Sequence, residues 1–183
     1  MRREHLIHSI HAYQSWDGGQ NPKFDRVSGQ LLDLKNKDDP RYQAACLRFA
    51  GEILGYAVTN KLVTDPKNTI GCCVPSSDPQ KQSDGLAQVL GQLVSHGLFA
   101  SAAAGLLLRH TKISKLAYGG DRSISVHRNS ICIARRPEIR GKAIFLLDDI
   151  TTSGNSLLAC EAMLLEAGVT VVICMAIGKT AND

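Results

Sequence analysis

Residues 144–156 read Ile-Phe-Leu-Leu-Asp-Asp-Ile-Thr-Thr-Ser-Gly-Asn-Ser. Four apolar residues without polar alternation indicate a strand buried on both faces, as in a parallel sheet covered by helices. Two adjacent carboxylates, Asp148 and Asp149, follow this run, and a turn rich in hydroxyl groups and glycine comes next. The apolar pattern after the turn is typical of a helix. We therefore predict a strand, a loop and the N-terminus of a helix.

The predicted loop combines two features that attract different parts of a ligand. Small residues and Gly154 lie where a helix presents unpaired N–H groups, and these groups favour an anion. Asp148 and Asp149 would repel the same anion. Both features are compatible with one ligand that carries a phosphate at one end and vicinal hydroxyl groups at the other. Ribose 5-phosphate has this chemistry, and ligands of parallel sheets bind at the C-terminal ends of strands.

The stretch resembles the motif with which type I phosphoribosyltransferases bind 5-phosphoribosyl-1-pyrophosphate (PRPP). In that motif, apolar residues precede two acidic residues, a four-residue spacer, a glycine, any residue, and Thr or Ser. The resemblance implies an α/β fold with a parallel sheet, a Rossmann-like core and helices on both faces. The alternative is an ordinary strand-to-helix turn with capping hydroxyl groups. Paired aspartates at the end of a buried strand disfavour that alternative.

The resemblance also implies a role for each motif residue. Asp148 and Asp149 are expected to hold the ribose 2- and 3-hydroxyl groups, close to the cation that develops on the sugar. The 5-phosphate is expected at Thr151, Thr152, Ser153, Gly154, Asn155 and Ser156. Mg²⁺ is expected as the cofactor, bound mainly through PRPP oxygens and water, so no dedicated protein metal site is predicted.

Composition sets limits on the protein class. The 183 residues are 44% hydrophobic and 21% charged, which suits one globular core. A net charge of +4 fits a phosphate-rich ligand or a plain basic protein equally well, and is too small to indicate nucleic acid by itself. The six cysteines form no C-x-x-C pair, so we expect a reducing cytoplasm. No apolar run approaches eighteen residues, so we expect neither membrane spans nor secretion.

The chain divides into a polar N-terminal part and a core. Residues 1–42 contain several glycines and prolines, and we expect an N-terminal extension or a "hood", the part that holds the acceptor substrate in the family. His5, His8 and His11 recur at a helix-like spacing, which we interpret as a solvated helix face rather than metal ligands. Residues 43–183 are expected to form the phosphoribosyltransferase core.

Periodicity predicts the remaining elements. We expect helices over residues 42–63 and 85–96, and strands over residues 69–74, 130–134 and 169–177. Residues 99–108 are apolar and alanine-rich, and their pattern does not decide between helix and strand.

Two further loops are candidates for pyrophosphate binding by resemblance. The loop after the first core strand contains Ser76, Ser77 and Lys81, and the family binds pyrophosphate there, often through a strained peptide bond. A simple Pro-Ser turn is the alternative. The basic segment between residues 109 and 128 corresponds to a mobile loop that closes over PRPP, with Lys112, Lys115 and Arg122 as candidates. A surface for nucleic acid or a protein partner is the alternative for this segment.

The expected activity is transfer of 5-phosphoribose from PRPP to a nitrogen nucleophile, with release of pyrophosphate. Members acting on 6-oxopurines usually carry an aspartate three residues after the second acid, where this chain has Thr152. The sequence therefore favours orotate-, amido- or competence-type members, and it looks most like the ComF-like, amidophosphoribosyltransferase-like branch. The alternative is a non-catalytic, ComF-like module that binds PRPP or a nucleotide and has a regulatory or nucleic-acid-associated role, as a component of a bacterial defence or DNA-handling system. Most type I members form dimers, so a homodimer is expected by resemblance.

Overall fold

The computed structural model describes residues 6–81, 83–113, 123–134 and 136–181. The strands are β1 Ile7–Tyr13, β2 Thr69–Cys73, β3 Ser101–Ala102, β4 Leu107–Arg109, β5 Ile131–Ile133, β6 Ala143–Thr151 and β7 Val171–Thr180. The α-helices are α1 Arg26–Asp33, α2 Tyr42–Thr59, α3 Asp84–Ser95, α4 Ile124–Ser130, α5 Arg136–Ile139 and α6 Asn155–Glu166. Short 3-10 helices span Asp17–Gly19 and Pro66–Asn68. Among these residues no helix has the length and apolar character needed to cross a membrane.

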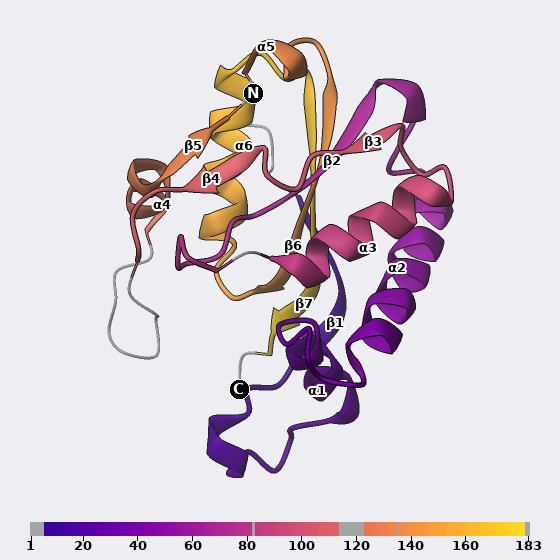
Figure 1. The fold of residues 1–183 in the computed structure, drawn as a ribbon, viewed down its shortest axis with the longest axis vertical. Coiled ribbons are helices and arrows are strands. Elements are labelled where there is room, and N and C mark those ends of the chain that lie inside the picture. The colour runs from indigo at the N-terminus through magenta and orange to yellow at the C-terminus, as the bar shows by residue number, and fades with distance from the viewer. Residues whose placement is uncertain (1–5, 82, 114–122, 135, 182–183) are drawn as a thin grey trace.

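Five strands form one sheet in the order β1-β7-β6-β2-β3, and every neighbouring pair is parallel. Helices α1, α2 and α3 cover one face, and α6 covers the other together with α4 and the antiparallel pair β4-β5 (Figure 1). The predicted α/β fold with a parallel sheet is confirmed.

Central strand β6 shows why the apolar run contains no polar alternation. Phe145 and Leu147 pack into the core cluster formed with α2 and α3. Ile144 and Leu146 pack into the second cluster, which lies under α6. All four side chains are fully buried. Because successive strand residues point to opposite faces, each face of β6 needs apolar side chains.

The predicted helices over residues 42–63 and 85–96 are present as α2 and α3, and the strand over residues 69–74 is β2. The strand over residues 130–134 is β5, and the strand over residues 169–177 is β7, which extends to Thr180. The undecided residues 99–108 contain two short strands, β3 and the first part of β4.

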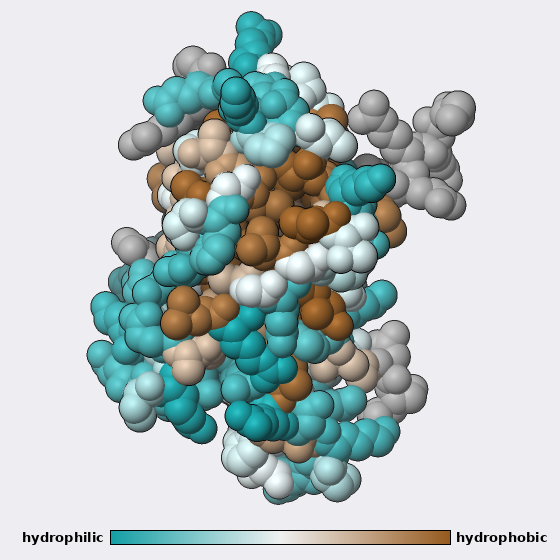
Figure 2. All heavy atoms as spheres, turned by 90° about the vertical axis from the view of Figure 1, so that its right-hand side faces the viewer, coloured by the Kyte–Doolittle hydropathy of each residue, from teal (hydrophilic) through white to brown (hydrophobic). Residues whose placement is uncertain are grey.

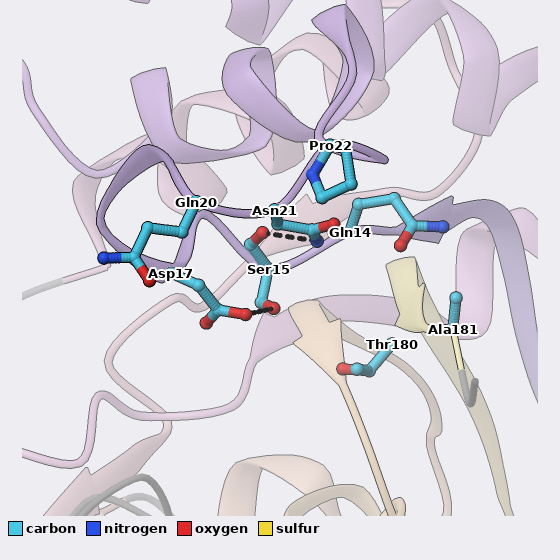
Figure 3. Close-up of a pocket in the computed structure, with 8 residues that line it drawn as sticks. All are labelled: Gln14, Ser15, Asp17, Gln20, Asn21, Pro22, Thr180 and Ala181. Atoms are coloured by element: carbon cyan, nitrogen blue, oxygen red, sulfur yellow. Dashed lines mark hydrogen bonds between the residues drawn. The ribbon is translucent and has the colours of Figure 1, made fainter.

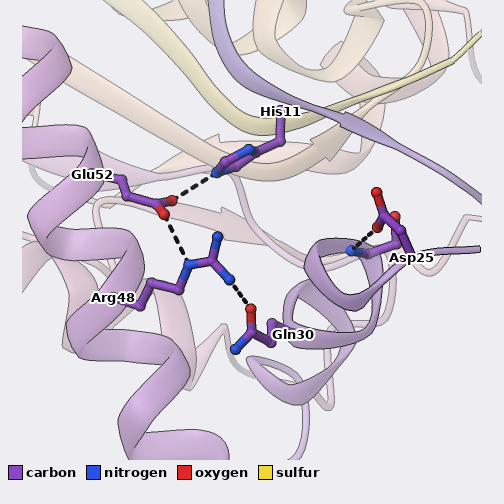
Figure 4. A network of polar contacts seen from close by, with 6 residues as sticks. His11, Asp25, Gln30, Arg48 and Glu52 are labelled. Carbon is purple, nitrogen blue, oxygen red and sulfur yellow. Dashed lines mark hydrogen bonds and ion pairs between the residues drawn. The ribbon is translucent and has the colours of Figure 1, made fainter.

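The helix-like reading of the histidine spacing is wrong, because residues 7–13 form edge strand β1 beside β7. His8 Nδ1 lies 3.2 Å from the hydroxyl group of Tyr56, and His11 Nε2 lies 2.7 Å from Glu52. Glu52 also accepts from Arg48, which in turn contacts Gln30 of α1 (Figure 4). The two described histidines thus belong to a polar network that joins the N-terminal part to α2.

The face covered by α2 and α3 is hydrophilic in its lower part, whereas hydrophobic residues gather higher up (Figure 2). An apolar hollow of about 450 Å³ lies between the ends of these helices, with Leu54, Val58 and Leu98 in its lining.

Candidate active site

The carboxyl ends of β1, β7, β6 and β2 lie at the same edge of the sheet, because these strands are parallel neighbours. Four segments meet there: the loop after β1, the loop after β2, the motif loop after β6, and the end of β7. Ligands of open parallel sheets bind outside such an edge. The motif predicted from the sequence therefore lies where this topology places binding sites.

The two acids of the motif point to opposite faces of the sheet. Asp148 accepts a hydrogen bond from the hydroxyl group of Ser156 on α6, at 3.1 Å. Asp149 forms an ion pair with Lys35, which follows α1, at 2.7 Å between Nζ and Oδ2. This arrangement follows from the period of two along a strand. Asp148 is therefore oriented from the α6 side of the sheet, and Asp149 from the α1 side.

Asp148 lies deeper than Asp149. Burial, and then the charge of Asp149, raise the pKa of Asp148 to about 7 from 3.8. The hydrogen bond from Ser156 opposes this shift because it stabilises the charged form. A carboxyl group with this pKa can accept or release a proton near neutral pH.

Asp149 has a fixed partner on each oxygen. Its Oδ1 accepts from the backbone N–H of Ile150 at 2.7 Å, while Oδ2 contacts Lys35. Burial is the largest single influence on the pKa of Lys35 and lowers it. The charge and hydrogen bond of Asp149, together with the charges of Asp148 and Tyr13, raise the pKa overall. Lys35 reaches this place because the backbone of Leu34 packs directly on Gly85, where any Cβ would overlap the Leu34 carbonyl.

The loop that follows leaves the start of α6 open. Gly154 takes the N-cap position with φ of +80°, and no side chain caps the helix. A Cβ at Gly154 would overlap Ile7 of β1, so glycine is required both for its conformation and for its contact. The N-terminus of α6, where the helix dipole is positive, therefore faces the motif loop and favours an anion there.

Two threonines line the same loop. Thr151 Oγ1 is buried and has no hydrogen-bond partner among the described residues. Thr152 Oγ1 lies 2.8 Å from Thr180 Oγ1 at the end of β7, which ties the motif loop to the neighbouring strand. Of the predicted phosphate residues, Thr151 to Ser156 thus form one continuous turn.

A buried arginine, Arg109, contacts the loop after β2. Arg109 of β4 donates from Nε to the carbonyl oxygen of Ser76 at 2.5 Å, and it also contacts Ser130 and His127. The peptide bonds of this described loop are trans, so the Ser77 N–H points away from Arg109. The Ser77 carbonyl accepts from Ile113 N–H. The loop therefore presents the Ser77 N–H on the side opposite Arg109. It lacks the strained peptide bond that the resemblance implied.

The candidate lysines have different positions. Lys112 forms an ion pair with Asp78 at 2.8 Å, so the start of the basic segment contacts the loop after β2. The hydrogen bond from Lys112 lowers the pKa of Asp78. Lys81 is exposed and donates its backbone N–H to the Asp78 carbonyl. Lys115 and Arg122 lie outside the described residues.

The donor atoms at this edge suit magnesium. Asp148 and Asp149 supply carboxylate oxygens, the ligand type that Mg²⁺ prefers, and this ion usually keeps several waters. In the described ranges no three His, Cys, Asp or Glu side chains converge on one point. The two carboxylates would fit an ion that takes its remaining ligands from water and a phosphorylated ligand.

The fold and the edge together define a class: an α/β protein with the parallel sheet and acidic strand end of the type I phosphoribosyltransferases. Residues 95–181 match the family model described as the phosphoribosyl transferase domain. The matched residues include β6, the motif loop, α6 and β7.

Two solved structures are similar to the chain. A hypoxanthine phosphoribosyltransferase from Staphylococcus aureus shares 10% identity, with 84% of this chain and 76% of that chain covered and a TM-score of 0.43. A purine phosphoribosyltransferase from Pyrococcus horikoshii OT3 shares 12% identity, with 72% and 83% covered and a TM-score of 0.41. No curated protein matches the chain.

Three residues at the carboxyl edge of the sheet do not belong to the sequence motif. They are Lys35, Arg109 and Thr180, which contact Asp149, Ser76 and Thr152 respectively. Arg109 lies in the basic segment of the sequence and Lys35 in a stretch of mixed charge, and neither pattern predicts its partner. The position of Thr180 after an apolar strand is the one local signal that could have suggested a place at the carboxyl edge.

Proposed function

We propose that this protein binds PRPP together with Mg²⁺ and transfers 5-phosphoribose to a nitrogen nucleophile, releasing pyrophosphate. The observation that carries the proposal is the end of β6, where two carboxylates immediately precede a glycine turn and an uncapped helix N-terminus. The carboxylates suit the ribose hydroxyl groups, and the N–H groups suit the 5-phosphate.

In the proposed reaction, the lone pair of the acceptor nitrogen forms a bond to the anomeric carbon of PRPP. The bond from that carbon to the pyrophosphate oxygen breaks, and its electron pair leaves with pyrophosphate. The proton of the acceptor nitrogen passes to solvent. Bound Mg²⁺ would supply positive charge to the leaving pyrophosphate.

The side chains of the chain would then bind and orient the sugar. Asp148 and Asp149 would accept hydrogen bonds from the two ribose hydroxyl groups, and their charge would favour the developing cation. The buried hydroxyl group of Thr151 and the N–H groups at the start of α6 would hold the 5-phosphate, a remote group whose binding energy orients the reacting carbon.

The loop after β2 would bind the pyrophosphate end. Ser77 would contribute its backbone N–H, held in place by Arg109 through the Ser76 carbonyl. Ser76 and Lys81 complete the candidate set of this loop, and Lys112 lies beside it through Asp78. Membership of the ComF-like branch and the pairing of two chains belong to this proposal as expectations of the family resemblance.

The test measures pyrophosphate release from PRPP and Mg²⁺ with a panel of nucleobases and amides, alongside PRPP binding by calorimetry. We expect binding and release for the wild type, and loss of both for the double variant Asp148→Asn, Asp149→Asn. Circular dichroism of this variant controls for folding. Tight PRPP binding without release for any acceptor would reject the enzyme and favour the non-catalytic, ligand-sensing module. Unchanged PRPP affinity in the double variant would rule out the ribose contacts.

A further inference from the structure

The outward face of α2 carries no charged residue. The helix has 18 residues, of which only Arg48 and Glu52 are charged. Both lie on the flank that contacts the N-terminal part, where Glu52 binds His11 (Figure 4). A helix that is apolar on all sides is usually a buried helix. In the part of the chain that the structure describes, however, the outward face of α2 is exposed.

Five nonpolar residues form a stripe along this face, which we call the α2 stripe. They follow one another at steps of three or four residues, so they lie on one side of the helix, and all five are exposed. They are Ala44, Leu47, Gly51, Gly55 and Val58. Leu47 is 56% exposed and Val58 is 63% exposed. Val58 also borders the apolar hollow on the side of the molecule where hydrophobic residues gather (Figure 2). Exposed apolar side chains that lie together mark an interaction surface.

The two glycines of the stripe have no role inside the chain. Gly51 and Gly55 take no positive φ, and a Cβ at either position would point into open space. Glycine destabilises the interior of a helix relative to alanine, so neither position favours it for local reasons. The close approach of a second backbone is the physical reason that accounts for both glycines.

Four residues of this face surround a hole of the kind found in coiled coils. Gly51, Leu54, Gly55 and Val58 have the spacing i, i+3, i+4 and i+7, and a side chain of a facing helix packs between four such residues. Glycine at two of the four positions makes the hole deep enough for a large side chain. Leu47 lies four residues before Gly51, at the same distance from it as Gly55. When two antiparallel α2 helices cross at Gly51, Leu47 of each copy therefore lies over the hole of the other.

We infer that the α2 stripe is a self-association surface, through which two copies of this chain pair by antiparallel α2 helices. Gly51 lies near the two-fold axis, and Leu47 of each copy packs into the hole of the other. This interface is isologous and therefore closed, so association ends at the dimer. A parallel pair would place Leu47 against Leu47 and would leave both holes empty.

Charges at the two ends of α2 favour the same direction. Asp38 precedes the helix and Lys61 follows it, and neither side chain has an ion-pair partner among the described residues. Antiparallel pairing brings Asp38 of one copy to the end that carries Lys61 of the other, whereas parallel pairing would bring like charges together. Complementary charges of this kind fix the orientation of an interface.

The α2 stripe is separate from the candidate active site. A cavity at the carboxyl edge lies between the loop after β1 and the end of β7 (Figure 3), and none of its described lining residues belongs to α2. Pairing through α2 therefore leaves this edge open in both copies. The inference assigns a surface to the pairing of two chains expected from the family resemblance, and it does not depend on PRPP binding.

Sedimentation equilibrium at increasing protein concentration measures the association. We expect a reversible monomer–dimer equilibrium for the wild type. Gly55→Leu fills the hole, so it should raise the Kd of the dimer by about tenfold or more. This variant should fold, because position 55 faces open space within the chain. Gly91→Leu is the matched control, since Gly91 of α3 is also exposed and faces open space, and it should leave the Kd unchanged.

Cross-linking tests the centre of the interface. The background is Cys132→Ser, which removes the exposed native thiol. With copper–phenanthroline as oxidant, Gly51→Cys should form an intermolecular disulfide, because two residues beside the axis come within the range of this bond. Gln43→Cys is the control on the same helix, since Gln43 is exposed but does not belong to the stripe, and it should cross-link far more slowly.

The outcomes separate this inference from the proposed function. A wild type that stays monomeric at every concentration would overturn the inference, and so would a wild-type Kd in Gly55→Leu. Equal cross-linking of Gly51→Cys and Gln43→Cys would also overturn it. Calorimetry should give the same PRPP affinity for the wild type and Gly55→Leu. Failure of PRPP to bind to either protein would overturn the proposed function alone.

Discussion

The ammonium group of Lys35 lies 2.7 Å from Oδ2 of Asp149, so a residue from the N-terminal part contacts the acidic end of the central strand. The pair orients the outer carboxylate and brings one positive charge to a site that we propose binds a polyanion. Both side chains are partly exposed, so solvent screens the attraction and its contribution to stability is small. We therefore expect Lys35 to matter for binding more than for folding.

Lys35→Met should weaken PRPP binding about tenfold, equivalent to about 1.4 kcal/mol, because a cation near the ligand and the orientation of Asp149 are both lost. Calorimetric titration with PRPP and Mg²⁺ measures this effect. The free energy of unfolding should fall by no more than about 1 kcal/mol. Lys37→Met is the matched control, since Lys37 lies 3.8 Å from Asp84 instead. Tighter PRPP binding by Lys35→Met would show that Lys35 competes with the ribose for Asp149.

Asp148 should make stability depend on pH. Its pKa is raised to about 7 in the folded protein from 3.8, chiefly by burial, so the folded state keeps a proton that the unfolded chain has released. The free energy of unfolding therefore decreases as pH rises, since the folded state binds more protons in this window. The stabilising contribution is fully present below about pH 4 and is lost as pH rises through about 7.

Urea denaturation of the wild type and of Asp148→Asn between pH 4 and 8 tests this dependence. Asparagine does not titrate, so the difference in unfolding free energy between the two proteins should change by an amount on the order of a few kcal/mol. Asp38→Asn, at an exposed position, is the control. Parallel curves for the wild type and Asp148→Asn would contradict the raised pKa.

The central strand and its acids could be predicted because their signals are local. An apolar run without alternation specifies a strand buried on both faces, and β6 fulfils this through Ile144 to Leu147. The opposite directions of Asp148 and Asp149 also follow from the strand period alone. Helices α2 and α3 were equally predictable, since their apolar stripes extend over several turns.

Strand β1 could not be predicted because an edge strand buries little and carries polar residues. Its sequence is Ile-His-Ser-Ile-His-Ala-Tyr. The histidines are three residues apart, a spacing that also places side chains on one face of a helix. The parallel pairing with β7 joins residues more than 160 positions apart, and no local pattern records such a contact. The contact of Leu34 with Gly85, which brings Lys35 to Asp149, is non-local in the same way.

Gly154→Ala should destabilise the protein by two separable effects. A residue with a side chain costs about 1–2 kcal/mol at φ of +80°, and the new Cβ would also overlap Ile7, at a further cost of about 1–3 kcal/mol. Gly141→Ala is the matched control, because Gly141 has φ of +77° and open space around its Cβ position. Urea denaturation should show a larger loss for Gly154→Ala. Equal losses would mean that β1 does not restrict the motif loop.

Arg109 should act as a positioning residue for the loop after β2. Its guanidinium group is buried and donates to the Ser76 carbonyl, which turns the Ser77 N–H outward. Arg109→Lys keeps the charge but loses the planar arrangement of donors, so not all of the contacts to Ser76 and Ser130 can be kept. We expect the free energy of unfolding to fall by about 1–3 kcal/mol, as for a buried group left unsatisfied.

PRPP binding separates positioning from stability alone. At a temperature where both proteins remain folded, Arg109→Lys should weaken PRPP binding about tenfold and leave ribose 5-phosphate binding unchanged, since only PRPP carries the pyrophosphate that Ser77 would contact. Arg128→Lys is the matched control, because Arg128 forms its ion pair with Glu166 on the surface of α6, and such pairs contribute about 0–1 kcal/mol. Equal weakening of both ligands by Arg109→Lys would mean that Arg109 supports the edge as a whole, because a residue acting through Ser77 affects only the pyrophosphate end.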